Sequence, residues 1–146
     1  MGELNGMDFD EFVEKIVKTV GMAIEQRTEN YVTIVGSVGD GRKQRVWIRP
    51  LGLDYQNRLI IGVMSPAMVL VAGQELAKGI ANSLLRDNSR IIHGGWAIES
   101  TKEGDYLIVK DTLIANTTET AELEASMTAV AIVADEMEKR LQQDVF

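Results

Sequence analysis

The chain has 146 residues, a formal net charge of −7 at pH 7 and no cysteine. A chain of this length suits one domain, which buries roughly 70% of the surface that the unfolded chain exposes. The absence of cysteine excludes disulfides and thiolate sites, and the negative charge disfavours nucleic acid and anionic lipid as partners.

The first residues of the sequence carry no recognisable targeting signal. The first residues lack the basic and apolar regions of a signal peptide, and no apolar run approaches the ~20 residues of a membrane span. We therefore expect one cytoplasmic domain over residues 1–146, without membrane contact.

The first predicted element is a helix from Phe9 to Gln26. Apolar residues recur there at helical spacing, and Asp8 followed three residues later by Glu11 resembles a capping box.

The next segments alternate as strands do. Residues 31–38 and 42–49 are β-branched or alternating and flank Gly39-Asp40-Gly41, which predicts a hairpin. Residues 58–64 are apolar on both faces, as in an interior strand.

Ser65-Pro66 is a helix-start signal and predicts a helix from there to about Asp87. The first turns of this predicted helix are apolar on all faces, so other parts of the protein must bury them on every side. Residues 94–99 and 105–113 form a second predicted strand pair, and Thr117 or Thr118 caps a final helix. That helix carries a stripe typical of core packing rather than of a coiled coil: Leu123, Met127, Val130, Ala134, Met137 and Leu141.

The predicted order is α-β-β-β-α-β-β-α. Short connections between strands favour an antiparallel sheet flanked by helices, so the expected fold class is α+β in a single domain.

Several short patterns accompany this order: Leu84-Leu85-x-x-Asn88, Gly95-Trp96-Ala97-Ile98, Thr112-Leu113, Glu122-Leu123 and Ala134-Asp135. Together with the order of elements, they resemble the type III secretion chaperone-like superfamily, and within it the YbjN-like, uncharacterised bacterial branch. The resemblance implies a homodimeric, non-enzymatic fold that binds other polypeptides.

The residues themselves argue against an enzyme. His93 is the sole histidine, and neither a serine elbow nor a thiol accompanies it. The glycines at 36–41 resemble a phosphate-binding loop, but a strand rather than a helix follows them. We expect no catalytic residue, no metal and no cofactor.

Two surfaces are candidates for partner binding. Arg45, Trp47 and Arg49 share one face of a strand, as in interface hot spots, unless Trp47 is a core residue. In that case a groove beside the first helix, with Phe9, Phe12 and Ile16 on its apolar stripe, becomes the candidate, and one of these three is expected to stay partly exposed.

The leading hypothesis is a dimeric chaperone or adaptor that holds a protein or peptide. The alternative is a regulatory module that uses its dimer crevice and its arginines to bind a small anion.

Overall fold

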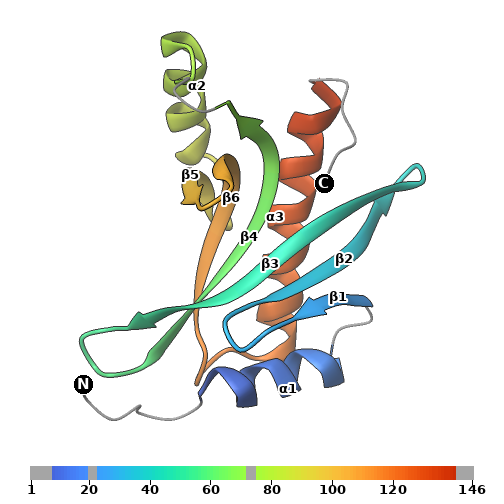
Figure 1. Cartoon of the computed structure of the whole chain (residues 1–146), viewed down its shortest axis with the longest axis vertical. Helices are drawn as coiled ribbons and strands as arrows, with labels where there is room; N and C mark the ends of the chain where they lie inside the picture. Colours follow the sequence, from blue (N-terminus) through green and yellow to red (C-terminus); the bar gives the residue numbers. More distant parts are fainter. Residues whose placement is uncertain (1–7, 20–22, 72–74, 141–146) are drawn as a thin grey trace.

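The computed structural model describes residues 8–19, 23–71 and 75–140. Within these ranges the chain forms three helices and one six-stranded antiparallel sheet (Figure 1). The elements in chain order are α1 (Phe9–Thr19), β1 (Ala23–Arg27), β2 (Val32–Gly39), β3 (Arg42–Leu53), β4 (Leu59–Leu70), α2 (Lys78–Asn88), β5 (Gly95–Thr101), β6 (Gly104–Ile114) and α3 (Thr120–Arg140). The α+β class predicted from the sequence is confirmed.

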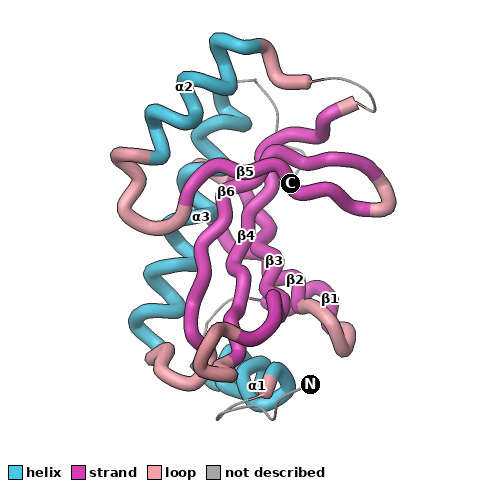
Figure 2. The backbone as a smooth tube through the Cα atoms, turned by 90° about the vertical axis from the view of Figure 1, so that its left-hand side faces the viewer, coloured by secondary structure: helices cyan, strands magenta, loops and turns pink. Residues whose placement is uncertain are grey.

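The strands lie in the order β1-β2-β3-β4-β6-β5, so β1 and β5 are the two edges. Both α2 and α3 lie on the same side of the sheet, and no described helix covers the opposite face (Figure 2). We call this second face the open face. Side chains of alternate residues along each strand point to this face.

The hydrophobic core lies between α3, α1 and the covered face of the sheet. Four residues of the stripe predicted on the last helix are buried there, Met137 packs against the core, and Leu141 lies outside the described residues. The buried four are Leu123, Met127, Val130 and Ala134.

The predicted starts of the first helix and first hairpin are confirmed. The Glu11 amide donates to Asp8 Oδ1 at 2.9 Å, which caps α1. Asp40 and Gly41 have φ values of 52° and 72° between the paired residues Gly39 and Arg42, as a tight hairpin turn requires.

The first helix is shorter than predicted, because residues 23–27 form β1 instead. Their backbone pairs with β2, in a register that sets Ala23 opposite Val35. All five side chains are exposed, Ile24 at 37% among them, so no buried stripe holds this segment in a helix. Backbone pairing with the sheet overrides helix propensity here.

The prediction of a helix from residue 65 is also wrong. β4 continues to Leu70, and α2 begins only at Lys78. The register of β4 against β6 shifts between Pro66 and Met68, and such a bulge accommodates a proline inside a sheet. The apolar run is therefore part of a strand, in which Leu70 is buried and Val69 is 48% exposed. Ser65 donates to the Arg45 carbonyl instead of capping a helix.

Candidate partner-binding surfaces

The structure places Phe9, Phe12 and Ile16 in the core. Their exposed fractions are 9%, 0% and 1%, so the expectation that one of them stays partly exposed is not met. They face α3 and the sheet, together with the buried Val13 of the same apolar stripe. A groove beside α1 therefore has no exposed aromatic residue in this structure.

Arg45, Trp47 and Arg49 do lie together on the open face. The Trp47 ring is half-buried and meets the Tyr106 ring edge-on, with the ring centroids 5.3 Å apart at 89°. Because Trp47 belongs to β3 and Tyr106 to β6, the two rings meet across β4, where the fully buried Met64 lies opposite Trp47. The open face thus has a small aromatic core of its own.

Both arginines of this face already form ion pairs with carboxylates of the protein itself. Arg45 donates to Glu25 of β1 at 2.8 and 3.2 Å, and Arg49 pairs with Glu99 of β5. The hydrogen bond from Arg45 lowers the pKa of Glu25 and raises that of Arg45. The pair stabilises the fold while Glu25 is ionised, and its contribution is lost as the pH falls through the lowered pKa.

Replacing Trp47 by alanine should lower the free energy of unfolding by about 2–3 kcal/mol. This is less than the ~3–5 kcal/mol of a fully buried aromatic, because Trp47 is half-buried, while the ring pair adds to the loss. Chemical denaturation measures the effect, and Trp47→Phe should recover most of it. A change below about 0.5 kcal/mol would instead mark Trp47 as an exposed recognition residue.

At the β5 edge of the sheet, the side chain of Asn88 in α2 forms hydrogen bonds with the backbone of the edge strand. The Trp96 amide donates to Asn88 Oδ1 at 2.6 Å, and Asn88 Nδ2 donates to the Trp96 carbonyl at 3.3 Å. A side chain on Gly95 would place its Cβ 3.1 Å from the Asn88 carboxamide, so glycine leaves room for this contact. Asn88 takes the position that a neighbouring strand would occupy.

Beyond Trp96 the edge of β5 is open. Backbone groups alternate in direction along a strand, so those of Ile98 and Ser100 point to the same outer side as those of Trp96. Within the described part of the chain, no hydrogen bond reaches them from that side. The edge is therefore available for pairing with another strand.

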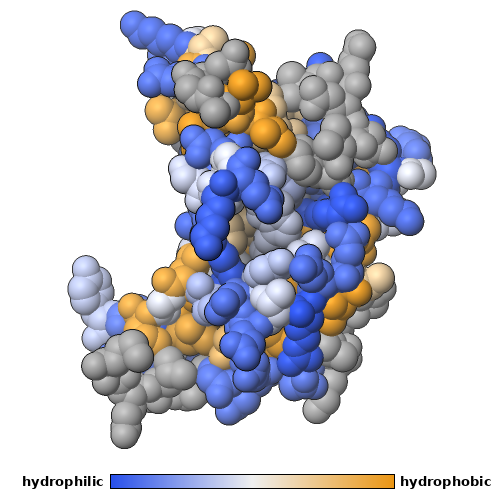
Figure 3. All heavy atoms as spheres, in the orientation of Figure 1, coloured by the Kyte–Doolittle hydropathy of each residue, from blue (hydrophilic) through white to orange (hydrophobic). Residues whose placement is uncertain are grey.

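An apolar groove of about 280 Å³ runs between α2 and β5. Its walls include Leu76, Leu85 and Ile98, and the last two are 67% and 49% exposed. Ile80, on the same helix, is 52% exposed. Figure 3 shows hydrophobic side chains gathered beside α2 at the upper end of the molecule. We call the groove and the open edge together the α2–β5 surface.

The α2–β5 surface was not predicted from the sequence. Leu85, Asn88 and Ile98 occur only within the patterns of the resemblance, where no role was assigned to them. A signal for it does lie in the sequence of α2, because the apolar residues Ile80, Leu84 and Leu85 do not fit one helix face. Of these three residues, only Leu84 is buried in the structure.

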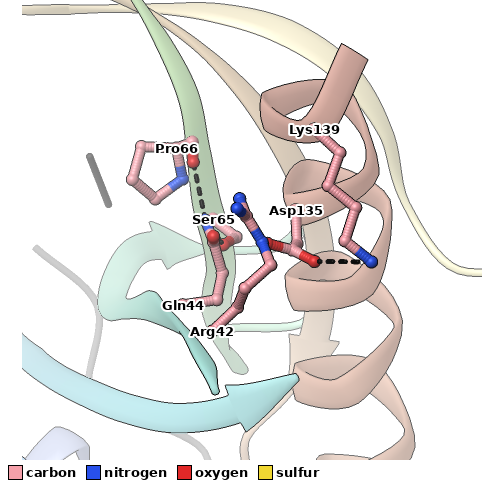
Figure 4. A network of polar contacts seen from close by, with 6 residues as sticks. All are labelled: Arg42, Gln44, Ser65, Pro66, Asp135 and Lys139. Carbon is pink, nitrogen blue, oxygen red and sulfur yellow. Dashed lines mark hydrogen bonds and ion pairs between the residues drawn. The ribbon is translucent and has the colours of Figure 1, made fainter. Parts of the chain in front are cut away.

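A polar network lies between β3, β4 and the second half of α3 (Figure 4). Arg42 Nε lies 2.7 Å from Asp135 Oδ1, and Lys139 lies 3.6 Å from the other oxygen. Gln44 is fully buried and its Nε2 donates to Ser65 Oγ at 2.9 Å and to the Pro66 carbonyl at 2.7 Å. Asp135 is 2% exposed, so its buried charge requires Arg42.

The surroundings of His93 do not form a nucleophilic site. Ser126 is fully buried and its hydroxyl donates to Asp111 Oδ2 at 2.7 Å, while His93 Nδ1 lies 3.7 Å from the same oxygen. A serine nucleophile needs a base at its own hydroxyl and an open approach. The carboxylate here orders both neighbours instead. Among the described residues, no group of three or more His, Cys, Asp or Glu side chains is placed to hold a metal ion.

These features define an α+β module with one covered and one open sheet face, an open edge strand and an exposed apolar groove. No family model matches the chain, and no curated protein matches it. No helix in the described ranges combines the length and the apolar character needed to cross a membrane.

Proposed function

We propose that the protein is a non-catalytic module that forms a homodimer and holds a polypeptide partner. The observation that carries this proposal is the α2–β5 surface, where an open strand edge runs beside an exposed apolar groove. Open backbone groups and exposed apolar side chains together are the features that polypeptide partners recognise.

The resemblance to the secretion chaperone-like superfamily implies the same two properties, and a cytoplasmic location is part of the proposal. The net charge of −7 favours a protein partner over nucleic acid.

The alternative of a small anionic ligand receives less support. Its candidate residues, Arg45 and Arg49, are engaged by Glu25 and Glu99, so an anion would have to displace a carboxylate of the protein itself.

A second copy of the chain is the occupant that we propose for the α2–β5 surface. Two edge strands related by a two-fold axis pair antiparallel, with Ile98 of one copy opposite Ser100 of the other. This arrangement brings the exposed Arg86 of one copy toward the β5–β6 turn of the other, where Lys102 and Glu103 are both exposed.

We expect wild-type protein to be a dimer at micromolar concentration and Ile98→Lys to be a monomer. A lysine at this position removes apolar contact area and sets two like charges against each other across the axis. Sedimentation equilibrium measures both masses. Leu53→Lys is the matched control, because Leu53 is a 36%-exposed apolar residue at the far end of β3, and this variant should remain dimeric. A monomeric wild type would contradict the dimer, and a dimeric Ile98→Lys would place its interface elsewhere.

The polypeptide-holding part has a separate test. An array of overlapping peptides probed with wild-type protein should show binding to a subset of extended segments. Absence of binding to every peptide would remove this part of the proposal, whatever the oligomeric state.

A further inference from the structure

A cavity of about 230 Å³ lies between the C-terminal end of α2 and the second half of α3, two helices on the same side of the sheet. It is separate from the α2–β5 groove, with which it shares only Trp96. Its lining has four apolar and four charged residues: Ile91, Trp96, Val133 and Met137, and Asp87, Arg90, Glu136 and Arg140.

The apolar part of this lining is held in place by the rest of the fold. Trp96, Val133 and Met137 are partly buried and pack against the hydrophobic core. The backbone of Trp96 is also fixed by its two hydrogen bonds with Asn88. Indole rings and methionine sulfur both make favourable contacts with aromatic rings. The preformed apolar lining therefore favours an aromatic ring as its ligand.

The volume of the cavity limits the size of that ligand. A cavity of about 150 Å³ is enough to bind benzene, whereas pockets for drug-sized ligands occupy about 300–1,000 Å³. At about 230 Å³ the cavity has room for one aromatic ring with a short head group.

The charged part of the lining shows which head group fits. Asp87 Oδ1 lies 2.7 Å from Arg90 Nη2, so these two charges compensate each other. Glu136 and Arg140 are exposed, and neither forms an ion pair with a described residue. They are one helical turn apart on α3, where side chains are about 5–6 Å apart at Cβ. A head group with both a positive and a negative charge can therefore contact both residues.

We propose that this cavity binds a free amino acid with an aromatic side chain. Its ring packs against Trp96 and Met137, its carboxylate faces Arg140, and its ammonium group faces Glu136. A free amino acid carries both charges on one carbon at neutral pH, whereas a residue inside a polypeptide carries neither. The proposal goes beyond the proposed function, because it concerns a small ligand and a cavity outside the α2–β5 groove.

The experiment titrates full-length protein with L-phenylalanine and follows the indole N–H signals by NMR. The chain has two tryptophans, and Trp47 lies on the open face, so only the Trp96 signal should shift at millimolar ligand. The variant Trp47→Phe assigns the two signals.

Three analogues of phenylalanine test the recognition of the head group. Phenethylamine lacks the carboxylate and 3-phenylpropanoate lacks the ammonium group, so each should bind about threefold more weakly, as expected for the loss of one exposed ion pair. N-acetyl-phenylalaninamide lacks both charges and should bind about tenfold more weakly.

Two charge reversals should invert the order of these ligands. Glu136→Lys should make 3-phenylpropanoate a better ligand than phenylalanine, and Arg140→Glu should do the same for phenethylamine. Both positions are exposed, so the core stays intact. Glu124→Lys is the control, because Glu124 is an exposed acid of the same helix outside the cavity, and this variant should retain the wild-type order.

Three outcomes would overturn the proposal. The first is no shift of the Trp96 signal at millimolar phenylalanine. The second is equal binding of phenylalanine and its three analogues, because the charged residues would then play no part. The third is an unchanged order of ligands in both charge-reversal variants. None of these outcomes affects the sedimentation or peptide-array tests, so the proposed function is judged separately.

Discussion

Phe12→Ala should lower the free energy of unfolding by about 3–5 kcal/mol, as expected for deleting a fully buried aromatic side chain. Phe12 has no exposed surface and lies in the core between α1, α3 and the sheet. Its removal leaves a cavity that the surrounding apolar side chains fill only in part. Chemical denaturation measures the loss, and the two-state form of the transition should be retained.

Tyr55→Ala is the matched control for Phe12. Tyr55 is an aromatic residue at the tip of the β3–β4 hairpin and is fully exposed, so its removal should change stability by less than about 0.5 kcal/mol. If Phe12→Ala were as stable as wild type but failed to bind peptides, the groove beside α1 would again become the candidate surface.

Gly94→Ala should lower the free energy of unfolding at least as much as Phe12→Ala, because the backbone conformation and surroundings of Gly94 leave no room for a side chain. Gly94 has a φ of 78°, and a Cβ there would lie 2.5 Å from the Lys110 carbonyl oxygen and 2.9 Å from its carbon. Strain of about 1–3 kcal/mol from the positive φ combines with a clash that β6 relieves only by moving. We expect a loss of about 4 kcal/mol or a failure to fold, measured by denaturation or by soluble yield.

Two other glycines separate the contributions to this effect. Gly104 has a φ of 134° with nothing within 4 Å of its Cβ position, so Gly104→Ala reports strain without a clash. Gly79 lies in α2 with no neighbour within 4 Å, and Gly79→Ala should stabilise the helix by roughly 0.5–1 kcal/mol. A Gly94→Ala variant no less stable than Gly104→Ala would show that β6 yields to the extra methyl group without cost.

The fold class could be predicted because its strongest signals are local. The turn at Asp40-Gly41 and the alternation on both sides of it depend on neighbouring residues, and the structure confirms the hairpin. β1 could not be predicted in this way, because five exposed side chains carry no burial pattern and the segment is held by backbone bonds to β2. The helix predicted to start at Ser65-Pro66 was wrong, because β4 continues past Pro66 through a bulge.

The candidate site residues were likewise predictable only where the signal lies within one strand or helix. Period-two spacing placed Arg45, Trp47 and Arg49 on one face, and they lie there. Their engagement by Glu25, Glu99 and Tyr106 joins strands far apart in the sequence, and alternation within one strand holds no information about such contacts. Helical spacing identified Phe12 as apolar-facing, but it could not say whether the apolar stripe of α1 meets the core or a partner.

The single carboxamide of Asn88 has a consequence for solubility. An unpaired strand edge is a template on which further chains can add, and a protein with open edges on both sides of its sheet risks growth into fibres. Because Asn88 occupies the backbone groups of Trp96, only the stretch around Ile98 and Ser100 remains for pairing. A two-fold pair between two copies consumes that stretch in both of them at once. In the proposed dimer, the Asn88 side chain thereby limits edge-to-edge assembly at β5 to a closed pair.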